Sequence, residues 1–163
     1  MHDDGEFAAA LRQRVKGEVR FDPVSRMLYR TDASLYAIQP VAVVVPADAE
    51  DVVETVRTAS CHGVPVLPRG GGTSLSGQAV GRAVVLDLSK RMNRILEIDE
   101  EERWVRVEPG VVLDELNAWL RPRGLMFGPD VATSSRANIG GMIGNNSSGA
   151  RSLLYGKTID HVL

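Results

Sequence analysis

The chain has 163 residues, a formal net charge of −2 and 44% hydrophobic residues, which suits roughly one domain with a substantial core. The nearly balanced charge, with no basic stripe between aromatic residues, argues against a nucleic-acid partner. A single cysteine, Cys61, excludes an internal disulfide and a cysteine-rich metal site. No apolar run reaches the ~20 residues of a transmembrane helix and the acidic start is no signal peptide, so we expect a cytoplasmic protein, or one peripheral to the inner membrane face.

Residues 1–40 are expected to hold one helix and a connecting segment. Apolar residues recur at helical spacing between positions 6 and 16, which predicts a short amphipathic helix; they are Phe7, Ala8, Leu11 and Val15. From Val19 to Pro40 the pattern is irregular. We therefore expect no regular element there.

Residues 41–90 show a strand–helix–strand pattern. The unbroken apolar run 41–45 predicts a strand covered on both faces, and Asp48 is a plausible N-cap for the helix that follows. The expected apolar stripe of that helix is Val52, Val53, Val56 and Ala59, and Cys61 at its end is expected to pack inside. Residues 65–67 and 83–88 are two further expected strands. This order predicts a right-handed parallel unit with a ligand loop at the carboxyl edge.

The loop that follows the second strand reads PRGGGTSLSGQ from Pro68 to Gln78. Successive glycines followed by hydroxyl residues let backbone N–H groups turn inward around a phosphate or pyrophosphate. It is not a Walker loop, because no lysine occurs between it and Lys90, and a strand rather than a Rossmann helix follows it. The alternative is a glycine-rich surface turn.

Residues 91–163 begin with an expected hairpin and helix. Residues 95–99 and 104–108 alternate apolar and polar side chains across a charged turn. A helix should follow, with one apolar face that places Trp119 in the core; the face consists of Val112, Leu113, Leu116, Trp119 and Leu120. The chain stops at residues 160–163 where an apolar stretch starts, so we expect a fragment of a longer protein.

Residues 128–149 form a second glycine-rich segment, dominated by small and hydrogen-bonding side chains. Such a segment cannot hold its conformation by apolar packing alone, so it is either a mobile loop or shaped around a polar ligand. Two segments of this kind, some sixty positions apart in an otherwise regular chain, suggest two walls of one nucleotide site.

These residues resemble a known family. The motif at 69–74, Gly128-Pro129-Asp130, the run from Asn138 to Gly149 and Leu154-Tyr155-Gly156 are similar to the FAD-binding domain of the vanillyl-alcohol-oxidase (PCMH-type) flavoproteins. The resemblance is strongest to FAD-linked D-2-hydroxy-acid dehydrogenases: the glycolate oxidase flavin subunit, D-lactate dehydrogenase and D-2-hydroxyglutarate dehydrogenase. It implies an α+β fold with a small parallel βαβ subdomain at 41–90, followed by a truncated, mostly antiparallel α+β subdomain at 91–163.

The resemblance also implies a set of FAD contacts. The pyrophosphate loop would comprise Arg69, Gly70, Gly71, Gly72, Thr73, Ser74, Gly77 and Gln78. The cofactor wall would continue through Pro129, Asp130, Ser134, Ser135 and Asn138. The residues along the ribityl chain and flavin ring would be Gly140, Gly141, Gly144, Asn145, Asn146 and Gly149. Members that bind FAD covalently through the loop carry a histidine there, and positions 70–78 have none, so noncovalent FAD is expected.

The activity implied for the longer protein is oxidation of a D-2-hydroxy acid by hydride transfer to flavin N5. The resemblance places the base and the substrate-binding groups in a cap domain outside this chain, so no catalytic residue is expected here and the chain alone should be inactive. An iron–sulfur cluster would occur only in a C-terminal region outside this chain, and no metal site is expected within it. The alternatives are another PCMH flavoenzyme, such as an enolpyruvyl reductase or an alditol or phenol oxidase, and a nonenzymatic binding module for a phosphorylated ligand.

Overall fold

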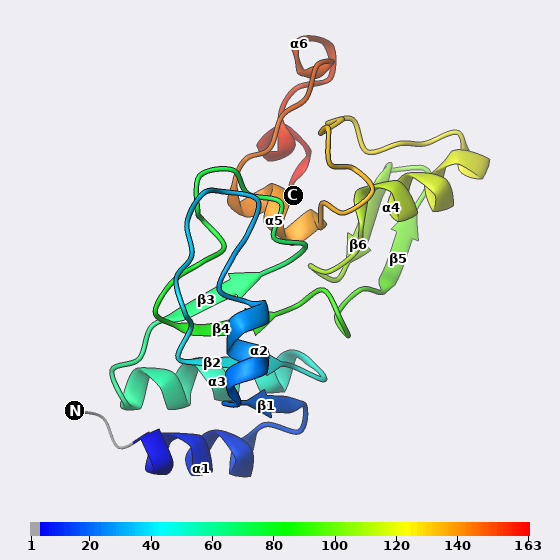
Figure 1. The fold of residues 1–163 in the computed structure, drawn as a ribbon. Helices are drawn as coiled ribbons and strands as arrows, with labels where there is room; N and C mark the ends of the chain where they lie inside the picture. Colours follow the sequence, from blue (N-terminus) through cyan, green and yellow to red (C-terminus); the bar gives the residue numbers. More distant parts are fainter. Residues whose placement is uncertain (1–3) are drawn as a thin grey trace. The chain divides into compact units, whose positions relative to one another are not determined.

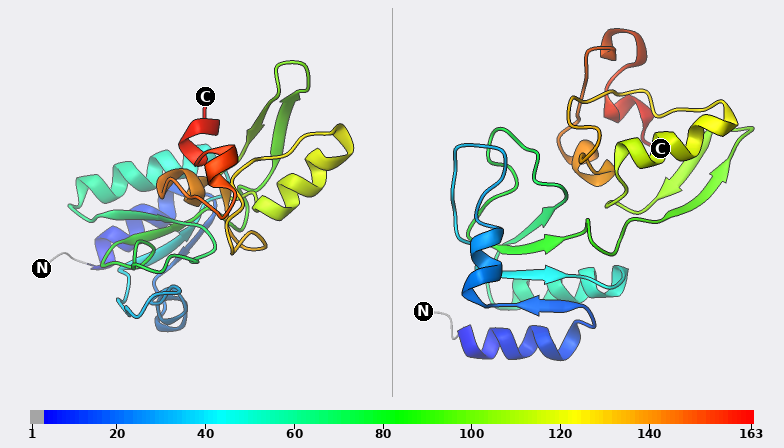
Figure 2. Two further views of the ribbon diagram at one scale, coloured as in Figure 1. Left: turned by 90° about the horizontal axis from the view of Figure 1, so that it is seen from above. Right: turned by 45° about the vertical axis from the view of Figure 1, so that its right-hand side comes forward.

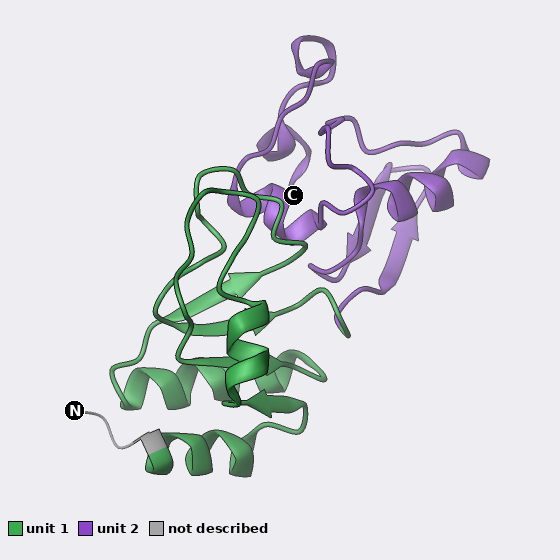
Figure 3. Cartoon of the chain, in the orientation of Figure 1, with its two compact units in different colours: residues 1–91 green, residues 92–163 purple. Residues whose placement is uncertain are grey.

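The computed structural model describes residues 4–163, which form two compact units (Figure 3): the residues up to Arg91, and Met92–Leu163. Each unit has its own cluster of buried apolar side chains.

The first unit is built on a four-stranded sheet (Figure 1). Its strands are β1 (Glu18–Arg20), β2 (Ala42–Val45), β3 (Val66–Arg69) and β4 (Val84–Asp87). The order in the sheet is β1-β2-β4-β3, with β1 antiparallel to β2 and the other three strands parallel. The predicted parallel strand–helix–strand unit is therefore present, but β2 and β3 are separated by β4, which inserts between them.

Both faces of the central strands are buried, as the apolar run 41–45 predicts. Helix α1 (Asp4–Arg14) and helix α3 (Ala49–Cys61) pack together and share one core cluster with the sheet. That cluster contains Phe7, Leu11 and Val15 from the N-terminal region, so the predicted apolar face of the first helix is confirmed. Helix α2 (Pro23–Leu28) contacts β2.

The expectation that residues 19–40 lack regular structure is wrong. The segment supplies edge strand β1 and helix α2, whose N-cap Asp22 accepts a hydrogen bond from the Ser25 amide at 2.8 Å, with Pro23 in the first turn. A cap residue followed by proline is a recognised start of a helix. A strand of only three residues, paired on one side, leaves almost no pattern in a sequence.

The apolar stripe expected on α3 is also partly wrong. Val53 and Val56 are exposed, whereas Thr55, Thr58 and Ala59 are buried. The Thr55 hydroxyl donates to the Asp51 carbonyl at 2.7 Å, so a polar side chain can face the sheet with its hydroxyl hydrogen-bonded to its own helix. Cys61 is exposed rather than packed inside.

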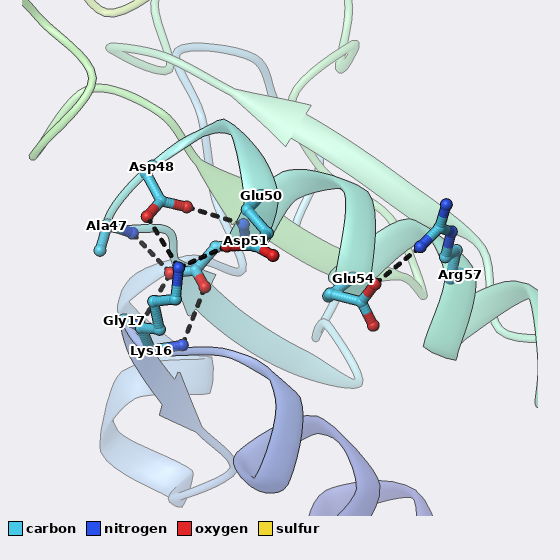
Figure 4. Close-up of polar contacts among 8 residues, drawn as sticks. All are labelled: Lys16, Gly17, Ala47, Asp48, Glu50, Asp51, Glu54 and Arg57. Atoms are coloured by element: carbon cyan, nitrogen blue, oxygen red, sulfur yellow. Dashed lines mark hydrogen bonds and ion pairs between the residues drawn. The ribbon is translucent and has the colours of Figure 1, made fainter.

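A buried carboxylate joins the start of α3 to the end of α1 (Figure 4). Asp48 caps the helix as predicted, accepting from the Asp51 amide at 3.0 Å. Asp51 itself is fully buried and accepts hydrogen bonds of 2.8 Å from three backbone amides, those of Lys16, Gly17 and Ala47. One side chain thereby satisfies three N–H groups of two turns that are distant in sequence.

The second unit contains the predicted hairpin, β5 (Ile95–Asp99) paired antiparallel with β6 (Trp104–Val107), and the predicted helix α4 (Leu113–Leu120). A 3-10 turn at Arg121–Arg123, helices α5 (Ile139–Gly144) and α6 (Ser152–Tyr155), and a 3-10 turn at Thr158–His161 complete it. Leu113, Leu116 and Leu120 pack with Ile139 and Met142 of α5, and Trp119 packs against this cluster. The second glycine-rich segment thus has an apolar anchor that its composition conceals.

Candidate functional site

The glycine-rich loop leaves the carboxyl end of β3, as predicted from the order of elements. It runs beside the segment of residues 29–37 that follows α2, as two views show (Figures 1 and 2). The Ala33 amide donates to the Gly72 carbonyl at 3.0 Å, and the Ala79 amide donates to Asp32 Oδ2 at 3.3 Å. The loop is therefore held along its length by a segment forty residues earlier in the chain.

The backbone of the loop offers unused hydrogen-bond donors. Among residues 4–163, none accepts a hydrogen bond from the five successive backbone N–H groups of Gly70–Ser74. Gly72 has φ +66° and Gly77 has φ +77°, a region that side-chain-bearing residues rarely adopt. Consecutive amides at a turn of this kind are the donors that an oxyanion needs.

Arg69 connects the loop to the earlier segment through its guanidinium group. Nη1 donates to the carbonyls of Tyr29 at 3.2 Å and Ala79 at 3.0 Å, and Nη2 donates to the carbonyl of Thr31 at 2.8 Å. A Cβ atom at Gly72 would lie 2.5 Å from Nη2. Glycine at 72 is favoured by its backbone angle, and a side chain there would have to displace the Arg69 guanidinium group.

Tyr29 carries a second connection, from the earlier segment to β4. Its hydroxyl donates to Oδ2 of the buried Asp87 at 2.5 Å, and Asp87 Oδ1 accepts from the amide and hydroxyl of Ser89 at 2.8 and 2.6 Å. Burial, followed by the hydrogen bond to Asp87 and the charge of that carboxylate, raises the pKa of the Tyr29 phenol well above its ordinary value of 10.0.

This raised pKa predicts a pH dependence of stability. Above pH ~10 the unfolded chain loses the Tyr29 proton while the folded chain keeps it, so the contribution is complete below pH ~10 and is lost as the pH rises toward the folded pKa. We expect the free energy of unfolding to fall more steeply above pH 10 in the wild type than in Tyr29→Phe. Urea unfolding at a series of pH values measures the two slopes. Tyr155→Phe, at an exposed position of the second unit, is the matched control and should keep the wild-type slope; equal slopes for Tyr29→Phe and wild type would contradict the expectation.

The remainder of the first loop is closed by side chains. Gln78 Oε1 accepts from the Ser74 hydroxyl and from the Ser76 amide, the latter at 3.2 Å. Tyr36 covers Gly77, where an added Cβ would lie 2.6 Å from the ring. Leu75 is exposed at the loop tip. These contacts give Ser74, Gly77 and Gln78 a role in loop shape.

In the second segment, Asn138 and Gly140 fix the start of α5. The Asn138 amide group donates from Nδ2 to the Gly110 carbonyl at 2.6 Å, and its buried Oδ1 has no protein partner among residues 4–163. At Gly140, an added Cβ would lie 2.6 Å from Pro109 Cβ, so the helix approaches the chain at residue 109 closely. Gly141 and Gly144, by contrast, are exposed, and a Cβ at either would meet nothing within 4 Å.

The rest of the segment is held by hydrogen bonds among residues 130–159. Asp130 accepts from Arg151 at 2.8 Å from Nε and 3.1 Å from the amide, and a Cβ at Gly149 would lie 2.1 Å from the Asp130 carbonyl oxygen. The hydrogen bond from Arg151 lowers the pKa of Asp130. Asn146, at φ +46°, accepts from the Ile159 amide at 3.0 Å, and Asn145 Nδ2 donates to the Gly141 carbonyl at 2.9 Å.

The predicted contact residues therefore differ in what they do within the fold. A structural role is evident for Asp130, Asn138, Gly140, Asn145, Asn146 and Gly149. Exposed backbone or small side chains are presented by Gly71, Ser135, Gly141 and Gly144. Pro129 is buried, and Ser134 donates its amide to Val131 and accepts from the Asp114 amide. Four residues outside the predicted set contact the first loop or support it: Tyr29, Asp32, Tyr36 and Asp87.

Two adjacent glycines of α5 differ in packing, because Gly140 lies against Pro109 whereas Gly141 faces open space. We expect Gly140→Ala to lower the melting temperature, because its Cβ would overlap Pro109 and overpacking costs about 1–3 kcal/mol. Gly141→Ala, one residue on and open to solvent, should be neutral or stabilising by up to ~1 kcal/mol. Thermal unfolding of both variants measures the difference. A Gly140→Ala protein as stable as the wild type would show that the close approach is not limiting.

In the part of the chain that the structure describes, no three His, Cys, Asp or Glu side chains gather into a group able to hold a metal ion. Likewise, no helix within residues 4–163 has the length and apolar character needed to cross a membrane.

Comparison with known proteins identifies what this arrangement is similar to. Residues 40–163 match the family model described as FAD binding domain. The chain is 48% identical over 165 aligned residues to a D-2-hydroxyglutarate dehydrogenase of Pseudomonas putida, covering 97% of this chain and 16% of that protein. It is 37% identical over 154 residues to the glycolate oxidase subunit GlcD of Bacillus subtilis, covering 92% of this chain and 33% of that subunit.

Solved structures of other proteins share the fold of this chain. An alkyldihydroxyacetonephosphate synthase superposes with a TM-score of 0.85 at 26% identity, over 95% of this chain and 31% of that one. The structure of p-cresol methylhydroxylase with substrate bound has a TM-score of 0.77 at 24% identity, over 88% and 30% of the two chains.

Proposed function

Because this chain belongs to the FAD binding domain family, we propose that its two glycine-rich segments hold FAD, noncovalently, in an enzyme that oxidises a D-2-hydroxy acid. The fold is the predicted PCMH-type FAD-binding fold, with a parallel sheet in the first unit and an antiparallel hairpin in the second. The chain spans 16% of the length of the Pseudomonas relative, so activity, substrate and acceptor are proposed for the whole protein.

The observation that carries the proposal is the row of five unpaired amides at Gly70–Ser74, at the carboxyl end of β3. Pyrophosphate oxygens accept hydrogen bonds from such amides without needing a lysine or a helix dipole. Gly70 and Gly71 have no side chain to obstruct the approach of an anion. The residues present thus fit the pyrophosphate of a dinucleotide.

In the second unit the candidate contact surface is the exposed side of α5. Gly141 and Gly144 lie there without side chains and with open space before them. The buried Asn138 Oδ1 accepts no hydrogen bond from residues 4–163. We propose that this surface lies along the flavin and ribityl part of FAD, while Gly140 and Gly149 keep the segment in shape.

Bound FAD would supply the redox chemistry, accepting a hydride from C2 of the hydroxy acid. The residues of this chain bind and orient: the loop amides hold negative charge, and the small residues of α5 allow a flat group to approach. No side chain of the described residues is proposed as the base.

We propose D-2-hydroxyglutarate as the first substrate to test. Four relatives that carry the name D-2-hydroxyglutarate dehydrogenase are 42–48% identical to the chain. A fifth relative of that name is 37% identical, as are the glycolate oxidase subunit of Bacillus subtilis and the D-lactate dehydrogenase of Kluyveromyces lactis. The choice of D-2-hydroxyglutarate over lactate and glycolate therefore rests on the higher sequence identity of four of these relatives.

The experiment is to purify the full-length protein, measure bound flavin by absorbance after denaturation, and follow reduction of an acceptor dye with D-2-hydroxyglutarate, D-lactate and glycolate. We expect about one FAD per chain, released without covalent attachment, and the highest kcat/KM with D-2-hydroxyglutarate. A folded protein that neither contains nor takes up FAD would refute the proposal. Turnover of polyols or phenols, but of no hydroxy acid, would replace the substrate class with that of another flavoenzyme.

A further inference from the structure

We propose that Arg69 acts as a positioning residue that sets the shape of the pyrophosphate loop, rather than as a cation that contacts the phosphate; this rests on the proposed FAD site. The sequence motif alone suggests the opposite, since an arginine beside a glycine-rich loop is an obvious partner for an anion.

The guanidinium group of Arg69 is already engaged by backbone carbonyls. Its two terminal nitrogens donate three hydrogen bonds of 2.8–3.2 Å to backbone carbonyls, those of Tyr29, Thr31 and Ala79. Its carbon also lies 5.4 Å from the centroid of the Tyr29 ring, a cation–π distance. An arginine that turned to a phosphate would leave these carbonyls without their donors.

The three carbonyls lie at the end of the loop and in the segment after α2. Ala79 closes the loop that Arg69 opens, so one side chain joins the two ends of the loop. Tyr29 and Thr31 belong to the segment after α2, whose Asp32 and Ala33 make separate hydrogen bonds to Ala79 and Gly72. The start, middle and end of the loop are therefore all hydrogen-bonded to residues 29–33. Arg69 makes two of these hydrogen bonds, and Asp32 makes one through its side chain.

Gly72 lies directly beside the guanidinium group. The left-handed backbone angle there brings the position where a Cβ would be to 2.5 Å from Arg69 Nη2. The guanidinium group is thus packed against the turn that orients the free amides. Holding a loop in its ligand-bound shape before binding lowers the entropy lost on binding, which raises affinity without a direct contact.

Asp32 supports the same arrangement. Burial alone would raise its pKa, but hydrogen bonds from Ser34 and Ala79 and the charge of Arg69 together lower it. Asp32 is therefore a carboxylate that accepts from the Ala79 amide while the Ala79 carbonyl accepts from Arg69. The residue at the end of the loop is held on both of its backbone groups.

The test compares Arg69→Lys and Arg69→Gln with the wild type in the full-length protein. Lysine keeps the charge but has no planar fork able to reach three carbonyls. If Arg69 positions the loop, both variants should bind FAD at least ~10-fold more weakly, a loss of ~1.4 kcal/mol. In the flavin-free protein, both should also show faster hydrogen–deuterium exchange in the peptides that carry the Ala33 and Ala79 amides. Arg57→Gln, which removes an exposed ion pair with Glu54 on α3, is the matched control and should change neither.

The outcomes separate the hypotheses. Rescue of FAD affinity by lysine, or weaker FAD binding with unchanged exchange at Ala33 and Ala79, would overturn positioning in favour of direct charge recognition. A third outcome is that the Arg69 variants exchange faster than the wild type at Ala33 and Ala79, but the wild type itself binds no FAD. That result would refute the FAD site and support the role of Arg69 in shaping the loop. Should the Arg69 variants not fold, Asp32→Ala weakens the same connection from the other side. It should then accelerate exchange at Ala79 and lower FAD affinity, and unchanged values of both would overturn the proposal.

Discussion

Replacing Gly72 with valine should abolish FAD binding while the parallel sheet stays folded. The residue has φ +66°, a conformation that costs an L-residue roughly 1–2 kcal/mol and a β-branched one more. Its Cβ would also overlap Arg69 Nη2, at 2.5 Å, and displace the guanidinium group from the loop. We expect FAD affinity to fall by roughly 100-fold or more, equivalent to about 2.7 kcal/mol.

Titration of FAD, followed by quenching of flavin fluorescence, measures this loss, and far-UV circular dichroism reports the fold. Gly81→Ala is the matched control at the far end of the same loop. Its Cβ would lie 3.5 Å from Leu67 Cδ2, an ordinary van der Waals contact, so its affinity should equal that of the wild type. Undiminished FAD binding by Gly72→Val would mean that the turn at residue 72 does not shape the cofactor site.

The largest effect on stability should follow from Asp51→Ala. Asp51 is fully buried and accepts from the amides of Lys16, Gly17 and Ala47. The three hydrogen bonds are part-buried. A donor left without a partner away from water costs about 1–3 kcal/mol, so the free energy of unfolding should fall by roughly 3–5 kcal/mol even if water reaches some of them. Asp51→Asn should lower the free energy of unfolding by less, because the remaining amide oxygen can still accept a hydrogen bond from one or two of the three backbone amides.

Chemical denaturation of the three proteins measures these values. Glu50→Ala is the control on the same helix turn. Its exposed ion pair with Lys16 is of a kind that contributes at most about 1 kcal/mol. If Asp51→Ala were no more destabilising than Glu50→Ala, the carboxylate would not be the main connection between the two turns that Figure 4 shows.

The elements that could be predicted are those with a local signal. The buried run 41–45, the cap at Asp48 and the alternating hairpin strands are all where the sequence indicates. Strand β1 was missed because it has three residues and depends on its partner β2. On α3, a rule based on hydrophobicity selects Val53 and Val56, yet Thr55, Thr58 and Ala59 face the core. Threonine is nearly isosteric with valine, and the Thr55 hydroxyl is satisfied by the Asp51 carbonyl of its own helix, so hydrophobicity alone does not predict which side chain is buried.

The candidate site divides in the same way. The residue types that allow an anion to approach, Gly70–Ser74, are evident from the sequence. The sequence does not predict which glycines are needed for packing. A Cβ at Gly140 or Gly149 would overlap a neighbouring segment of the chain, whereas a Cβ at Gly141 or Gly144 would meet nothing within 4 Å. Nor does a motif reveal that the charge of Arg69 is turned toward backbone carbonyls. These roles arise from contacts between segments far apart in the chain.

A crystal structure of the full-length protein with FAD measures the central claim most directly. It should place the pyrophosphate oxygens within about 3.2 Å of backbone nitrogens in Gly70–Ser74. A pyrophosphate held elsewhere, with those five amides facing solvent, would contradict it.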